Sequence, residues 1–94
     1  MEQPNATETA TAIVYEMKTV AVLLEKGVVE RLDAEQVSEK RANFTVTYRL
    51  ADAEKVEDLL RRCKGGMYGI MVDAGEYQDA FRKVSRLVDG VLQR

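Results

Sequence analysis

The side chains that most often carry out catalysis are scarce in this chain of 94 residues. It has no His and no Trp, and its one Cys is Cys63. Without His, a Ser or Cys nucleophile has to be activated by Lys or by a carboxylate. The sequence contains neither a Gly-x-Ser-x-Gly nor a Ser-x-x-Lys segment, which are frequent settings of such nucleophiles. The composition therefore predicts a protein that is not an enzyme, with no catalytic residue and no cofactor.

The acidic residues do not have the spacing of a metal site or of a catalytic pair of carboxylates. Asp73, Glu76 and Asp79 lie within one short span, but the span lacks the regularly spaced oxygen ligands of an EF-hand loop. Glu57 is followed four residues later by Arg61, a spacing typical of ion pairs on an exposed helix. We expect no tight metal site.

Composition and charge exclude several further classes. The formal net charge is −2, so the chain has no general attraction to nucleic acid or to anionic lipid. A hydrophobic content of 46% is typical of a globular protein, and no apolar run approaches the roughly 18 residues of a membrane span. The N-terminal residues lack the features of a signal peptide, and a single Cys cannot form an internal disulfide. We expect a cytoplasmic protein that does not bind membranes.

Elements that would position a functional surface can be predicted from hydrophobic periodicity. Apolar residues recur at helical spacing in three segments, 6–26, 53–64 and 76–92. Asn5 and Gly27 suit the two ends of the first helix, and Cys63 lies at the end of the apolar stripe of the second, where a small buried side chain is usual. Residues 1–5 are expected to form a tail before a single domain, 6–94.

The first helical segment has an alternative, because it is rich in Thr, Val and Ile, which favour strands. In that alternative 11–18 is a strand, and 20–24 pairs with 28–32 across a turn at Gly27. The periodicity of three and four favours the helix.

Strand periodicity is clearest in 43–50, where Phe44, Val46, Tyr48 and Leu50 alternate with polar residues. The short apolar run 67–74, bounded by glycines, indicates a buried strand, and the polar segment 33–42 is expected to be a loop. Together these elements predict a small α+β domain with about three helices packed on a short sheet. Two strands make a marginal sheet, so either a third strand lies near the N-terminus or a second subunit completes the core, and a homodimer is the prediction that we favour.

The strand at 43–50 and the helix after it resemble the first strand and helix of the ribbon-helix-helix DNA-binding proteins. The resemblance covers about residues 43–66. It implies a dimeric transcriptional regulator in which paired strands enter the major groove of DNA. Thr45, Thr47 and Arg49 would then face DNA, and the apolar residues between them would face the dimer core. Two features disagree with this family: 67–74 separates the helices, and the net charge is acidic.

Most of the observations favour a surface over a reactive site. The leading hypothesis is a protein-protein interaction module that acts as a small regulator, adaptor or inhibitor on a protein partner. The alternatives are the DNA-binding regulator above and a ferredoxin-like domain that senses a small molecule. Aromatic and Arg side chains are enriched in binding hot spots. The candidate interaction residues chosen on that basis are Tyr48, Arg49, Arg61, Arg62, Tyr68 and Arg82.

Overall fold

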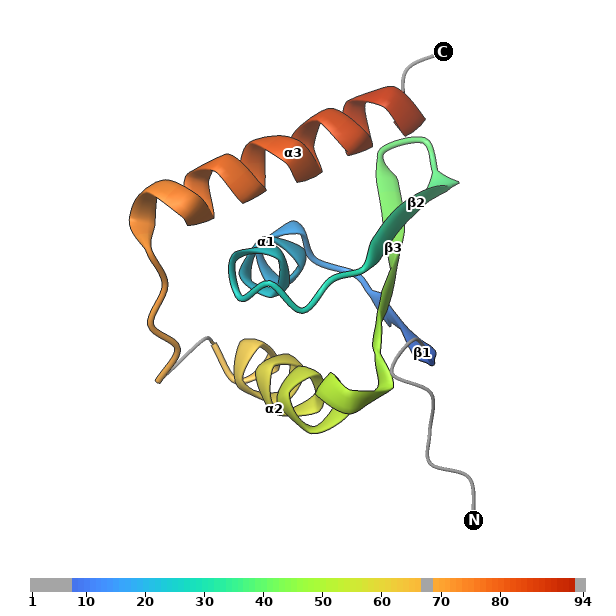
Figure 1. The fold of residues 1–94 in the computed structure, drawn as a ribbon. Coiled ribbons are helices and arrows are strands. Elements are labelled where there is room, and N and C mark those ends of the chain that lie inside the picture. The colour runs from blue at the N-terminus through green and yellow to red at the C-terminus, as the bar shows by residue number, and fades with distance from the viewer. Residues whose placement is uncertain (1–7, 67–68, 93–94) are drawn as a thin grey trace.

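The computed structural model describes residues 8–66 and 69–92, which form three helices and one antiparallel sheet of three strands (Figure 1). The elements in chain order are β1 (Thr9–Val14), α1 (Met17–Glu25), β2 (Arg31–Ser38), β3 (Arg41–Arg49), the short 3-10 helix η1 (Leu50–Asp52), α2 (Ala53–Lys64) and α3 (Ala74–Leu92). The predicted α+β class is confirmed. Completion of the sheet by a second subunit stays a prediction.

The middle strand of the sheet is β3, so the strand order is β1-β3-β2. Thr9 lies opposite Arg49 and Val14 opposite Phe44 in the first pair of strands. Arg31 lies opposite Thr47 in the second pair, which has an irregularity between Gln36 and Ser38. Both β1 and β2 are therefore edge strands.

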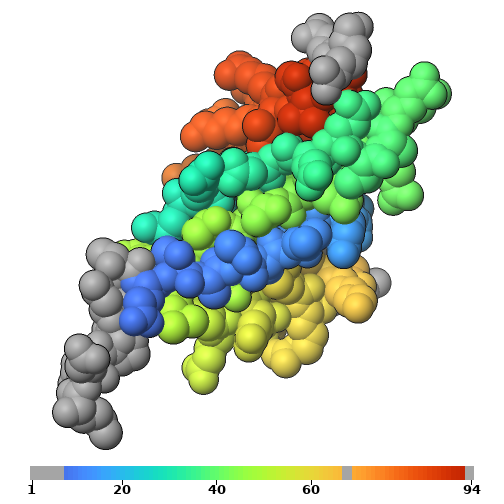
Figure 2. Space-filling model, turned by 90° about the vertical axis from the view of Figure 1, so that its right-hand side faces the viewer, coloured from blue at the N-terminus to red at the C-terminus, as the bar shows by residue number. Residues whose placement is uncertain are grey.

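All three helices cover the same face of the sheet, with α1 between α2 and α3 (Figure 1). Side chains alternate along a strand, so every second residue points toward the helices. These are the buried Val14 of β1 and Phe44, Val46 and Tyr48 of β3. They pack with Val20, Val22 and Leu23 of α1, Val56 and Leu59 of α2, and Val84 of α3. None of the helices in the described part of the chain covers the opposite face, and Figure 2 shows β1, β3 and β2 exposed there.

Three predicted elements agree with the structure. Helix α2 has the predicted bounds, and α3 begins two residues before the predicted start and ends at the predicted residue, Leu92. Strand β3 covers the predicted strand except that Leu50 already belongs to η1. Helix α1 ends just before Gly27, whose φ of 72° is the left-handed conformation that suits Gly after a helix.

The prediction of one helix over 6–26 was wrong for its first half. Residues Thr9–Val14 form a strand, and the helix begins only at Met17. The alternative was right in placing a strand there, although β1 ends at Val14 and not at Lys18. Its second part was wrong, because 20–24 is helical. The apparent helical periodicity was coincidental, because Ile13, which it includes in the apolar stripe, lies on the exposed face of β1.

Two other predictions were also wrong. Most of the predicted loop 33–42 belongs to β2 and to the start of β3. Within the predicted strand 67–74, residues 69–73 have no regular structure and α3 begins at Ala74, while 67–68 lie outside the described residues. Ile70 and Val72 still pack against the core, which explains why this segment is apolar. No helix within residues 8–66 and 69–92 is long and apolar enough to cross a membrane.

Candidate functional site

The free edge of β1 is the most distinctive surface in the described part of the chain. The Leu50 N–H donates to the Glu8 carbonyl at 2.9 Å, and these residues lie opposite each other in the register of β1 and β3. In an antiparallel pair, hydrogen-bonded and non-hydrogen-bonded residue pairs alternate. The N–H and C=O groups of Thr9, Thr11 and Ile13 therefore point away from β3, toward the free edge.

A groove lies beside this edge, between the end of β1 and the C-terminal half of α2. Its volume is about 270 Å³, and its lining is mostly apolar: Ile13, Val14, Tyr15, Glu16, Thr19, Leu60 and Lys64. The side chains of Ile13 and Tyr15 are 59% and 65% exposed, respectively. Exposed apolar side chains next to unpaired backbone groups are features of an edge to which another strand can be added. We refer to β1 and this groove together as the β1 edge.

The open face of the sheet is polar and has balanced charges. Thr11 lies beside Thr47, and Thr47 lies beside Arg31. Alternation places Arg31, Arg41 and Arg49 on this face, and Arg31 and Arg49 have carboxylate partners. Arg31 Nε is 3.0 Å from an Asp33 oxygen. Arg49 Nε is 3.6 Å from Asp52 and 3.9 Å from Glu30. Asp33 and Glu35 of β2 lie on the same face, so it carries little excess of the positive charge that attracts phosphate groups.

The structure separates the residues that the sequence suggested for an interaction surface. Tyr48 is only 8% exposed and belongs to the core. Arg49 lies at the end of β3 on the open face, whereas Arg82 lies on α3. Tyr68 lies outside the described residues. Among the five candidates that the structure describes, only Arg61 and Arg62, neighbours on α2, are close together.

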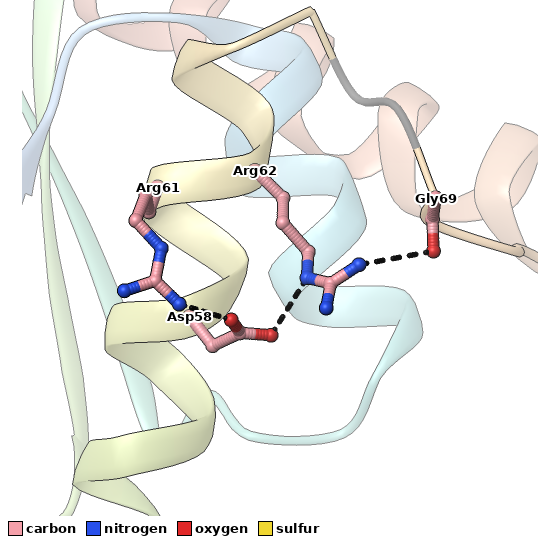
Figure 3. Close-up of polar contacts among 4 residues, drawn as sticks. All are labelled: Asp58, Arg61, Arg62 and Gly69. Carbon is pink, nitrogen blue, oxygen red and sulfur yellow. Dashed lines mark hydrogen bonds and ion pairs between the residues drawn. The ribbon is translucent and has the colours of Figure 1, made fainter.

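Asp58 holds both of these arginines in place (Figure 3). Arg61 Nη2 donates to one carboxylate oxygen at 2.5 Å, and Arg62 Nε donates to the other at 2.8 Å. The hydrogen bond from Arg61, together with that from Arg62, lowers the pKa of the Asp58 carboxyl below its ordinary value. Arg62 Nη1 also donates to the Gly69 carbonyl at 3.5 Å, so it connects α2 to the segment before α3. This arginine has a structural role within the chain.

A second hollow lies on α3, where the rings of Tyr77 and Phe81 contact each other with their centroids 6.2 Å apart and their planes tilted by 38°. Lys18, Gln78 and Arg82 complete its lining. Arg82 Nη1 is 3.5 Å from Asp79 Oδ1 on the same helix. The hollow is apolar with two cations at its rim, but it lies against a helix and adds no unpaired backbone groups.

The remaining reactive groups have structural explanations. Burial raises the pKa of the Cys63 thiol, although the Thr19 hydroxyl hydrogen-bonds to it and acts in the opposite direction. A raised pKa keeps the thiol protonated and unreactive. Asp73 accepts a hydrogen bond from the Glu76 N–H at 2.9 Å and so caps the start of α3. Neither group is arranged as a nucleophile or a general base.

The middle position of β3 differs from the arrangement in ribbon-helix-helix proteins. As the resemblance implied, Phe44, Val46 and Tyr48 face the core, and Thr45 and Thr47 face the other way. In that family, however, the strand pairs with the same strand of a second subunit. Here β1 and β2 of the same chain occupy both edges of β3. That pairing is therefore not available to β3 in this fold.

Comparisons with protein-family models, with curated proteins and with solved structures found no match to this chain. By their structure, the described residues form an α+β domain with an open three-stranded sheet and a free β1 edge. Sequence reasoning missed this edge. The segment Thr9–Val14 alternates Thr with Ala in its first half only, so its pattern indicates the strand weakly and does not indicate that one of its edges is free.

Proposed function

We propose that this chain is a non-enzymatic protein-binding domain whose β1 edge accepts an extended segment of a partner protein. The observation that carries the proposal is the row of outward-pointing backbone groups on Thr9, Thr11 and Ile13 beside the apolar groove. In β-strand addition, main-chain hydrogen bonds provide affinity and pockets for alternate side chains provide specificity. The β1 edge offers both.

The topology supports this proposal. The order strand, helix, strand, strand, helix is that of the first five elements of a ferredoxin-like domain. In such a domain a last strand follows the second helix by a right-handed crossover, and it lies next to β1. In this chain α3 follows α2 instead and packs along α1, away from the β1 edge (Figure 1). No residue of the ranges 8–66 and 69–92 occupies the position of that last strand, which could therefore accept a strand from another molecule.

Neither alternative function has a comparable observation in its favour. Arg31 and Arg49 on the open face are paired with carboxylates, so this face offers nucleic acid little excess of positive charge. This argues against the DNA-binding regulator. The ferredoxin-like order of elements agrees with the sensor hypothesis, but fold alone does not specify function. The groove beside β1 and the hollow on α3 are both open to solvent. Such open sites suit an extended peptide segment better than a small molecule that has to be enclosed.

The proposal can be tested by panning a phage-displayed library of short random peptides on the immobilised protein. Ile13→Lys removes an apolar contact at the β1 edge and adds a charge, so peptides selected on the original chain should lose binding. Val37→Lys is the matched control, because Val37 is 51% exposed on the other edge strand while Ile13 is 59% exposed. Peptides with alternating apolar residues that bind the control and not Ile13→Lys would support the proposal. Peptides that bind all three proteins equally, or no selection at all, would contradict it.

A further inference from the structure

We infer that the strand bound at the β1 edge is β1 of a second copy of this chain. The two β1 strands pair antiparallel about a two-fold axis, and the two sheets join into one of six strands. This inference rests on the proposed function, since it names the occupant of the same edge. Such an interface is isologous, which means that one surface must be complementary to itself.

The backbone of β1 meets this requirement. An antiparallel pair needs outward-pointing groups opposite outward-pointing groups, and these belong to the odd-numbered residues Thr9, Thr11 and Ile13. With the two-fold axis at Thr11, this residue lies opposite its own copy. Thr9 then lies opposite Ile13 of the second copy, and Ile13 lies opposite its Thr9. This register pairs every outward-pointing group within β1.

The side chains also fit this register. On the helix-covered face, Ala10 would lie opposite Ala12 of the second copy, and both are small and half-buried. On the open face, the exposed Ile13 would be covered by the methyl group and backbone of Thr9 from the other copy. Two chains paired in this way would leave β1 with neighbours on both sides, as β3 already has. An exposed edge in a monomer is a known liability for uncontrolled association, and closed pairing removes it.

Charge complementarity supports the same register. Alternation places Glu8 on the same face as Ala10, and the register places it opposite Val14 of the second copy. Val14 lines the groove together with Lys64 and Glu16. Lys64 makes no ion pair with any residue of the described ranges, so its ammonium is available to Glu8 of the second copy. Each dimer would contain this contact twice.

Amide hydrogen exchange followed by NMR at several protein concentrations tests directly whether β1 of a second copy occupies the β1 edge. The Ala10 and Ala12 amides point toward β3 and should be protected at every concentration. The Thr11 and Ile13 amides should exchange quickly in dilute protein and at least about ten-fold more slowly in the dimer, because a hydrogen-bonded amide exchanges only on opening. Fast exchange of both at all concentrations would overturn the inference. Peptide selection lost in Ile13→Lys would then still support the proposed function, so the two failures can be distinguished.

Disulfide cross-linking tests the register. In a Cys63→Ala background, Thr11→Cys should form an intermolecular disulfide, because paired residues lie about 5.5 Å apart between Cα atoms, within the range a disulfide spans. Ile13→Cys is the matched control. Its copy would lie four residues along the strand, about 14 Å away, and should not cross-link. Efficient cross-linking through Ile13→Cys, or none through Thr11→Cys in a variant that folds by circular dichroism, would overturn the register.

Exchanging the charges of Lys64 and Glu8 tests the register a second time, through the dissociation constant of the dimer. Lys64→Glu should weaken the dimer in sedimentation equilibrium, because it places a carboxylate against Glu8 of the other copy. Glu8→Lys should weaken it for the reciprocal reason. The double variant should restore the dissociation constant to within about three-fold of the original, because both contacts are re-formed with reversed charges. Additive weakening in the double variant would overturn the contact and the register that contains it.

Discussion

The same substitution, Gly to Ala, is expected to have opposite effects at two positions of this fold. Gly27 follows α1 with a φ of 72°, whereas Gly90 lies within α3. A Cβ atom added at either position would meet no atom of the described residues within 4 Å. Backbone conformation therefore determines both effects, without a contribution from steric overlap.

The magnitudes follow from these conformations. The left-handed region costs a residue with a Cβ atom about 1–2 kcal/mol, part of which is offset because Ala restricts the unfolded chain more than Gly does. Gly27→Ala should therefore destabilise the fold by about 1 kcal/mol. Gly within a helix is less favourable than Ala by about 0.5–1 kcal/mol, so Gly90→Ala should stabilise it by that amount. In a domain of this size, 1 kcal/mol changes the melting temperature by about 4–8 °C.

Urea unfolding followed by circular dichroism measures both changes on one scale. The free energy of unfolding should fall with urea concentration at the same slope in all three proteins. Equal slopes would show that the variants differ in stability alone. A Gly27→Ala variant as stable as the original chain would contradict the left-handed turn after α1. A destabilising Gly90→Ala change would refute the reasoning at that position. It would mean that a neighbour outside the described residues packs against α3 at Gly90.

Two further predictions follow from the pKa shifts. The lowered pKa of Asp58 contributes stability that is present above its unfolded pKa and is lost as pH falls through the folded one. The difference in urea midpoint between the original chain and Asp58→Asn should therefore be constant near neutral pH and narrow below about pH 4. An unchanged difference at pH 2 would contradict the Asp58 contacts. Because burial raises the pKa of Cys63, iodoacetamide should alkylate it slowly at pH 8 in the folded protein and faster in urea. Equal rates in the two states, measured by mass spectrometry, would contradict its burial.

The elements that could be predicted from the sequence are those with strong contrast between apolar and polar residues. In α2, Val56, Leu59 and Cys63 are buried, and most of the remaining residues are charged. In β3, the middle strand, Phe44 and Val46 are almost fully buried between polar neighbours. Both segments have one buried face and one solvent face, and their periodicity is therefore unambiguous.

The edge strands could not be predicted in the same way, because they bury less. The inward residues of β2 are Leu32, Ala34 and Gln36, all half-buried, and one of them is polar. In β1 the inward residues include two alanines, which differ little in hydropathy from the threonines between them. The candidate site is formed by β1, so it was missed for the same reason. Its identification required the register with β3, which no local pattern specifies.

The position of β1 in the chain also has a consequence during synthesis. This strand is made first, but its neighbour β3 is the last strand made, after α1 and β2. β2 and β3 form a local hairpin, whereas β1 has to wait for the whole of β3 before it can pair. A waiting strand rich in large apolar side chains would promote aggregation. Thr9 and Thr11 make β1 only weakly hydrophobic. The same residues that weaken its sequence pattern therefore also reduce its tendency to aggregate before β3 has been synthesised.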